Sequence, residues 1–131
     1  MRFKLTEEYK APNIFDPELA KEEVTPSENQ IEKEEVIEMT GKELLKIIKD
    51  ISGLSFDQLN SKIKSSGRFD KLVQQMEEKN KIASPILYYI EGKPVRYDGK
   101  HRLFAFAQVV GWITPFPILK VTLKESKSDE I

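Results

Sequence analysis

The residues best suited to chemistry form one short run, Asp98-Gly99-Lys100-His101-Arg102, between a predicted strand and a predicted helix. Three basic side chains in the first turn of a helix oppose the helix dipole, whose positive end lies there. A bound anion would offset this, because the first backbone N–H groups of a helix have no internal partner and favour negative charge. The run therefore predicts a phosphate site formed by Gly99, Lys100, His101 and Arg102, in which Gly99 lets the anion approach the backbone closely.

Each candidate residue also has a purely structural interpretation. Asp98 is a candidate catalytic residue that could hold a metal ion or accept a proton, but Asp-Gly is also a common turn. His101 is either a phosphate ligand or a partly buried histidine with satisfied nitrogens. Arg102 either contacts phosphate or forms an ion pair with the acidic N-terminal residues. Ser84 precedes a predicted strand, where its structural interpretation is the cap of a loop.

Length and composition set limits on the class of protein. The chain has 131 residues, enough for one domain with a core, and its 39% hydrophobic and 33% charged content is typical of a globular protein. It has no cysteine and one histidine, so we expect no disulfide and no metal site formed by protein ligands alone. No run approaches the roughly 18 apolar residues of a membrane span. With no signal-peptide pattern at its start, we expect a cytoplasmic protein with no membrane partner.

Charge divides the chain into two parts. Residues 1–39 carry 5 Lys or Arg against 11 Asp or Glu, whereas residues 40–131 carry 16 against 11. The basic part contains the predicted phosphate site, which favours a phosphate-bearing partner. We expect an acidic, partly extended N-terminal arm over residues 1–32, a folded domain over 33–124 and a polar tail over 125–131.

Local signals define the elements that must position the turn. Capping boxes at Thr40–Glu43 and Ser55–Gln58 begin two helices. The predicted helices cover residues 41–51, 56–64, 69–79 and 100–110. The predicted strands cover residues 2–5, 35–39, 86–90, 94–97 and 116–123. Pro117 is expected to place the start of the last strand at a sheet edge. Within the arm, Ile14, Phe15 and Leu19 are expected to dock on the core. The pattern predicts an α/β (α+β) domain with a small mixed sheet and surrounding helices.

In this order of elements, residues 69–121 resemble the ParB/sulfiredoxin superfamily. The shared pattern is a helix, a Pro-Ile strand entry, a hairpin, a Gly-x-x-Arg turn that starts an Ala-rich helix, a glycine and a final strand. The corresponding residues here are Ser84-Pro85-Ile86, Glu91-Gly92-Lys93, Asp98-Gly99-Lys100-His101-Arg102 and Gly111. The resemblance implies a ParB/sulfiredoxin-like fold and a phosphate-binding turn at Gly99, Lys100, His101 and Arg102. It also implies that Ser84 borders the pocket, as an alternative to its interpretation as a loop cap.

Branches of the superfamily differ at this turn. The sulfiredoxin branch has a catalytic cysteine where this chain has Lys100, which excludes sulfiredoxin chemistry. The chromosome-partition ParB proteins have Gly-Glu-Arg-Arg and a downstream helix-turn-helix domain, which we do not expect in this chain. The free-serine-kinase branch has Asp-Gly-His-His-Arg, close to the present turn, but the acidic base of that branch has no assignable counterpart here.

Three functions are compatible with the turn. The first is nucleotide binding, in which a nucleoside triphosphate brings Mg²⁺ to the site and is bound or hydrolysed. The second is a nucleic-acid-binding protein or nuclease that uses the turn on the phosphates of DNA or RNA, although a pI of about 6.0 argues against tight non-specific DNA binding. The third is a non-catalytic interaction module. We rank nucleotide binding first, and the sequence assigns no reaction.

Overall fold

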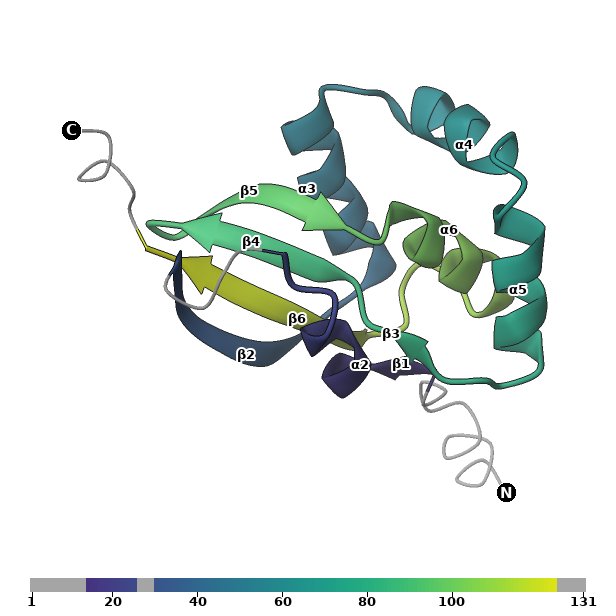
Figure 1. Cartoon of the computed structure of the whole chain (residues 1–131). Coiled ribbons are helices and arrows are strands. Elements are labelled where there is room, and N and C mark those ends of the chain that lie inside the picture. The colour runs from purple at the N-terminus through teal and green to yellow at the C-terminus, as the bar shows by residue number, and fades with distance from the viewer. Residues whose placement is uncertain (1–13, 26–29, 125–131) are drawn as a thin grey trace, which may run out of the picture.

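The computed structural model describes residues 14–25 and 30–124, which are organised around a mixed four-stranded sheet (Figure 1). Its strands are β2 (Ile31–Met39), β4 (Ile86–Ile90), β5 (Lys93–Asp98) and β6 (Phe116–Leu123), in the spatial order β2-β6-β4-β5. β4 and β5 form an antiparallel hairpin, and β6 runs antiparallel to β2 but parallel to β4. The predicted mixed sheet is confirmed at this level, within an α+β architecture.

Four helices lie on one side of this sheet (Figure 1): α3 (Gly41–Ser52), α4 (Phe56–Lys64), α5 (Phe69–Glu77) and α6 (Lys100–Val109). Both predicted capping boxes are present, with Thr40 and Ser55 accepting from the amides of Glu43 and Gln58. α6 buries four consecutive residues, as its apolar surface all round the helix predicts. α6 therefore packs on several elements at once, which fixes the position of its N-terminus.

A short helix of the N-terminal segment covers the opposite side of the sheet. β1 (Phe15–Asp16) pairs in parallel with β3 (Ile82–Ala83), and the short helix α2 (Pro17–Lys21) follows. Ala20 of α2 is fully buried. Within the arm predicted as partly extended over residues 1–32, these residues are helical instead: Pro17 starts a helix that Asp16 caps, and burial of Ala20 holds it on the sheet.

Two apolar clusters fill the space on either side of the sheet. The larger one joins the sheet to the four helices, and within it Phe15 packs against Phe106 and Phe116 with ring centroids 5.0 and 5.2 Å apart. The expected docking of Ile14 and Phe15 is thus confirmed, whereas the same expectation is wrong for Leu19, which is 38% exposed on α2. The smaller cluster lies under α2 and contains Ala20, Tyr88 and other buried side chains. Residues 14–25 therefore contribute to both clusters, and the folded body extends further towards the N-terminus than the predicted boundary at residue 33.

Pro117 does not mark a sheet edge, because β6 lies between β2 and β4. Pro117 pairs with Glu38 of β2, whereas the pairing of β6 with β4 begins only at Leu119, whose N–H donates to the Pro85 carbonyl. N–H groups two residues apart in a strand point to the same side. The missing N–H of Pro117 therefore falls before β4 begins, where no bond is lost.

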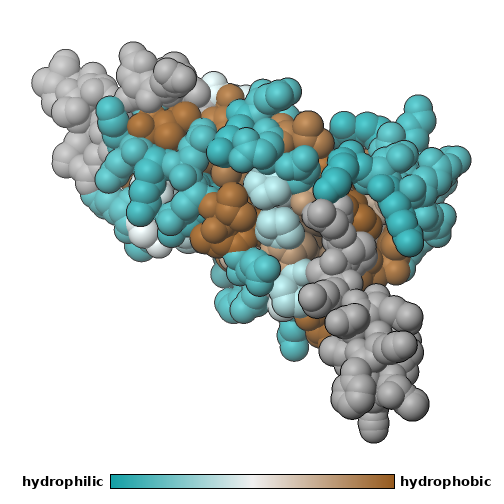
Figure 2. Space-filling model, turned by 90° about the horizontal axis from the view of Figure 1, so that it is seen from below, coloured by the Kyte–Doolittle hydropathy of each residue, from teal (hydrophilic) through white to brown (hydrophobic). Residues whose placement is uncertain are grey.

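The surface seen in Figure 2 carries hydrophobic residues in separate patches between hydrophilic ones. Two of the exposed apolar side chains of the described chain are Leu19 of α2 and Val36 of β2. No helix within residues 14–25 and 30–124 is long and apolar enough to cross a bilayer. The strand expected at residues 2–5 and the tail expected over 125–131 lie outside the described residues.

Candidate functional site

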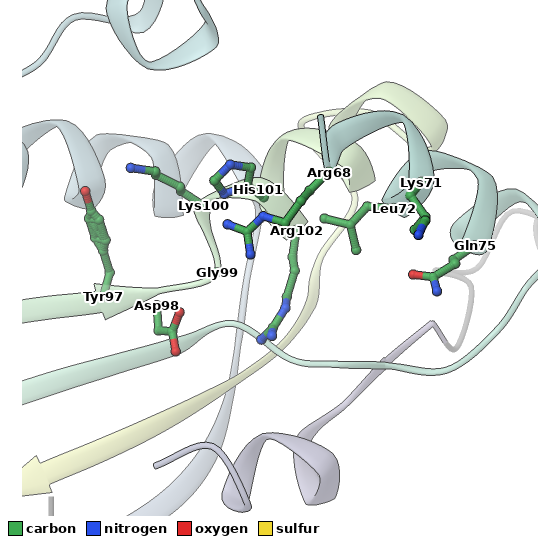
Figure 3. A pocket seen from close by; sticks show the side chains of 10 residues that line it. All are labelled: Arg68, Lys71, Leu72, Gln75, Tyr97, Asp98, Gly99, Lys100, His101 and Arg102. Atoms are coloured by element: carbon green, nitrogen blue, oxygen red, sulfur yellow. The ribbon is translucent and has the colours of Figure 1, made fainter. Parts of the chain in front are cut away.

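A cavity of about 540 Å³ lies between α5 and the start of α6 (Figure 3). All five residues of the turn predicted from the sequence line it. The other lining residues are Arg68, Lys71, Leu72, Gln75 and Tyr97. The cavity is therefore rich in cationic side chains, and among the described residues Asp98 is the only acidic one that lines it.

The two helices that border the cavity begin without a side-chain cap, unlike α3 and α4 with their capping boxes. Gly99 occupies the N-cap position of α6 with a φ of 113°, a conformation that glycine adopts most easily. The first internal bond of α6 runs from the Leu103 N–H to the Gly99 carbonyl, at 2.9 Å. The preceding amides of the first turn are thus the unpaired donors that favour an anion.

Gly99 also lies directly against Pro85. A Cβ at Gly99 would stand 3.0 Å from the Pro85 Cα, tighter than nine in ten Cβ contacts in proteins. Glycine is therefore favoured here both by its backbone conformation and by packing. The presence of glycine at this position is therefore explained by the fold alone, independently of any ligand.

His101 lies between basic neighbours at the centre of the site. Its Nε2 is buried and has no hydrogen-bond partner among the described residues. Burial lowers the pKa of His101, and the positive charges of Arg68 and Lys100 lower it further. In Figure 3 the Arg68 side chain reaches across from α5 towards His101. A bound anion would reverse this electrostatic effect by stabilising the imidazolium form.

Arg102 is engaged by the N-terminal segment. Its Nη1 and Nη2 donate to the two carboxylate oxygens of Glu23, at 2.8 and 3.0 Å. In Figure 3 its side chain runs away from His101, towards the N-terminal residues. The alternative interpretation of Arg102, an ion pair with acidic N-terminal residues, is therefore present in the structure. Arg102 nevertheless remains part of the cavity lining.

Asp98 and Ser84 occupy different surroundings from the basic cluster. Asp98 is exposed, and in Figure 3 its carboxylate points away from Lys100. Strand pleating explains this, because neighbouring residues Tyr97 and Asp98 project to opposite faces of the sheet. Ser84 is fully buried and does not line the cavity, so its predicted place at the pocket rim is wrong. The Ser84 N–H donates to Asp16 O, which draws the residue inward.

Sequence reasoning missed the α5 side of the cavity. Arg68, Lys71 and Gln75 recur at the spacing of one helix face. This polar face is distinct from the buried stripe of Phe69 and Val73. The spacing was visible in the sequence, but nothing local indicates that this face meets the start of α6.

Neither a metal-binding cluster nor a similar known protein assigns a function to this site. Within the described residues, no group of three or more His, Cys, Asp or Glu side chains comes together to hold a metal ion. Comparison with protein-family models, curated proteins and solved structures gave no match. The functional argument therefore rests on the geometry of the cavity and on the resemblance of the turn.

Proposed function

We propose that the cavity between α5 and α6 binds the phosphate groups of a nucleotide. The observation that carries the proposal is the convergence of Arg68 and Lys71 from one helix with Lys100 and His101 from another. Charged hydrogen bonds from several directions suit a polyphosphate better than a single carboxylate. The unpaired amides at the start of α6 add donors that require no side-chain ordering.

The resemblance to the ParB/sulfiredoxin superfamily supports the same proposal. α5, β4, β5, α6 and β6 follow one another in the order that the resemblance implies. The turn between β5 and α6 is the place where that resemblance puts phosphate. Mg²⁺ would arrive with a nucleoside triphosphate, because phosphate oxygens supply most of its ligands in such sites. The proposal covers binding and includes no reaction.

Isothermal titration with the nucleoside triphosphates, with and without Mg²⁺, tests this proposal. Arg68→Gln and Lys100→Gln should each weaken binding at least about tenfold, since a charged hydrogen bond contributes roughly 1.5–3 kcal/mol. Lys49→Gln is the matched control, because Lys49 is exposed on α3 and does not line the cavity. It should leave the affinity unchanged.

Three results would contradict nucleotide binding at this cavity. The first is the absence of a binding signal with every nucleotide, and the second is an equal loss of affinity in the cavity and control variants. The third is binding of short single- or double-stranded DNA alone, with a steep dependence on salt. That outcome would assign the cavity to nucleic-acid phosphates instead.

A further inference from the structure

Two arginines hold the N-terminal segment against the sheet. Residues 20–25, here called the strap, begin at the buried Ala20. Arg102 of α6 binds Glu23 of the strap, and Arg96 of β5 donates from Nη2 to the Thr25 hydroxyl at 2.6 Å. The Thr25 N–H in turn donates to the Tyr88 hydroxyl at 3.4 Å. The strap is thereby attached to the same helix that begins at the cavity.

Glu23 occupies the guanidinium of Arg102 in the geometry that a phosphate would use. Both carboxylate oxygens accept, one from each terminal nitrogen, in a bidentate pair. The Arg102 side chain is 21% exposed and that of Glu23 is 37% exposed, so the pair is partly shielded from water. Arg102 cannot hold this carboxylate and a phosphate in the same bidentate fashion, because both need the same N–H groups.

We propose that Glu23 is an internal competitor for phosphate at Arg102, and that ligand binding releases the strap. This inference rests on the proposed nucleotide site. A bound polyphosphate draws Arg102 towards the cavity, and the Glu23 carboxylate returns to water. The strap then loses one of its two arginine contacts, while Arg96 still holds Thr25. Ligand binding is thus coupled to the position of the strap.

Isothermal titration of Glu23→Gln with nucleoside triphosphates plus Mg²⁺, and separately with inorganic tripolyphosphate, tests the competition. Glu23→Gln should bind roughly threefold to tenfold more tightly than wild type, in line with the strength of a partly exposed ion pair. Glu22→Gln is the matched control, because it changes the net charge equally at the exposed neighbouring position. It should stay within about twofold of wild type, a bound set by screening of exposed charges.

A double substitution separates competition from a general charge effect. With Arg102→Gln in place, the further change Glu23→Gln should no longer tighten binding, because the contested guanidinium is gone. Tightening that persists in this background would overturn the proposal. Equal affinities of Glu23→Gln and Glu22→Gln would also overturn it, as would weaker binding by Glu23→Gln.

Hydrogen exchange of the wild-type chain provides a readout that needs no variant. The Glu23 N–H donates to the Ala20 carbonyl at 2.9 Å. Saturating ligand should accelerate exchange of this amide and cleavage by trypsin after Lys21. Slower exchange on ligand binding would contradict strap release. If no probe binds wild type or any variant, the proposed function itself fails, whereas wild-type binding without strap release overturns this inference alone.

Discussion

Gly99 packs against Pro85 so closely that a Cβ on Gly99 would lie 3.0 Å from the Pro85 Cα. This contact joins the start of α6 to the residue that precedes β4. It fixes the turn that carries the basic cluster relative to the sheet. The position of the turn that lines the cavity and the packing of the β4–β5 hairpin are therefore linked through one glycine.

Gly99→Ala should destabilise the fold through backbone strain and through its contact with Pro85. A second glycine-to-alanine variant separates these two effects. The φ of 113° at Gly99 strains any other residue by about 1–3 kcal/mol, and the contact with Pro85 adds to this loss. Gly111→Ala is the matched control, because Gly111 has a φ of 124° and open space around it. Urea unfolding should show a larger loss for Gly99→Ala. Equal losses would mean that the Pro85 contact contributes nothing.

Phe104→Ala should lower the free energy of unfolding by roughly 3–5 kcal/mol, the usual result of removing a buried aromatic ring. Phe104 is only 4% exposed and packs against Trp112 and Phe56, with ring centroids 5.4 and 5.5 Å away. Phe56→Ala tests the partner that is 37% exposed, and the loss should be smaller. A Phe104→Ala protein with wild-type unfolding behaviour would show that this helix face is not core.

Ser84→Ala should leave the fold as stable as wild type or stabilise it by up to about 1 kcal/mol, because a buried hydroxyl without a partner is unfavourable. The Ser84 Oγ is buried and makes no hydrogen bond within the described part of the chain. Ser55→Ala removes a hydroxyl that caps α4 and should lower the stability by about 1 kcal/mol. Thermal unfolding compares the two variants. A clear loss in Ser84→Ala would indicate an important hydrogen bond of that hydroxyl.

Because the chain has a single histidine, a change in folding stability at about pH 6.5 can be assigned to His101. Because burial and then Arg68 and Lys100 lower the pKa of His101, the unfolded chain binds a proton more readily than the folded one. Stability should therefore fall as the pH drops below about 6.5, and His101→Gln should remove that part of the loss. Proton NMR of the single imidazole measures the pKa directly. Parallel stability curves for the two proteins would contradict the prediction.

A bound phosphate ligand should shift the pKa of His101 in the opposite direction, upwards. A phosphate beside His101 stabilises the imidazolium, so the pKa should rise in the complex and affinity should increase as the pH falls. The measurement is the NMR titration of His101 with and without tripolyphosphate. An unchanged titration curve at saturating ligand would place the phosphate elsewhere.

Most of the local elements could be predicted from residues that lie close together in the sequence. The capping boxes at Thr40 and Ser55 begin α3 and α4 as predicted, and β4 and β6 match their predicted bounds. These features depend on residues a few positions apart, where side-chain chemistry and periodicity act directly. The same local logic predicted the turn at Gly99, whose role as a phosphate site stays a prediction.

The residues that surround this turn come from distant parts of the chain and could not be predicted locally. Arg102 finds Glu23 79 positions away, and α5 presents Arg68 and Lys71 to the start of α6. The central place of β6 in the sheet likewise comes from pairing with strands distant in sequence. Local periodicity states which face of an element is polar or apolar, but not which other element that face will meet. That choice depends on how all the apolar faces are buried together, and it sets both the cavity and the strap.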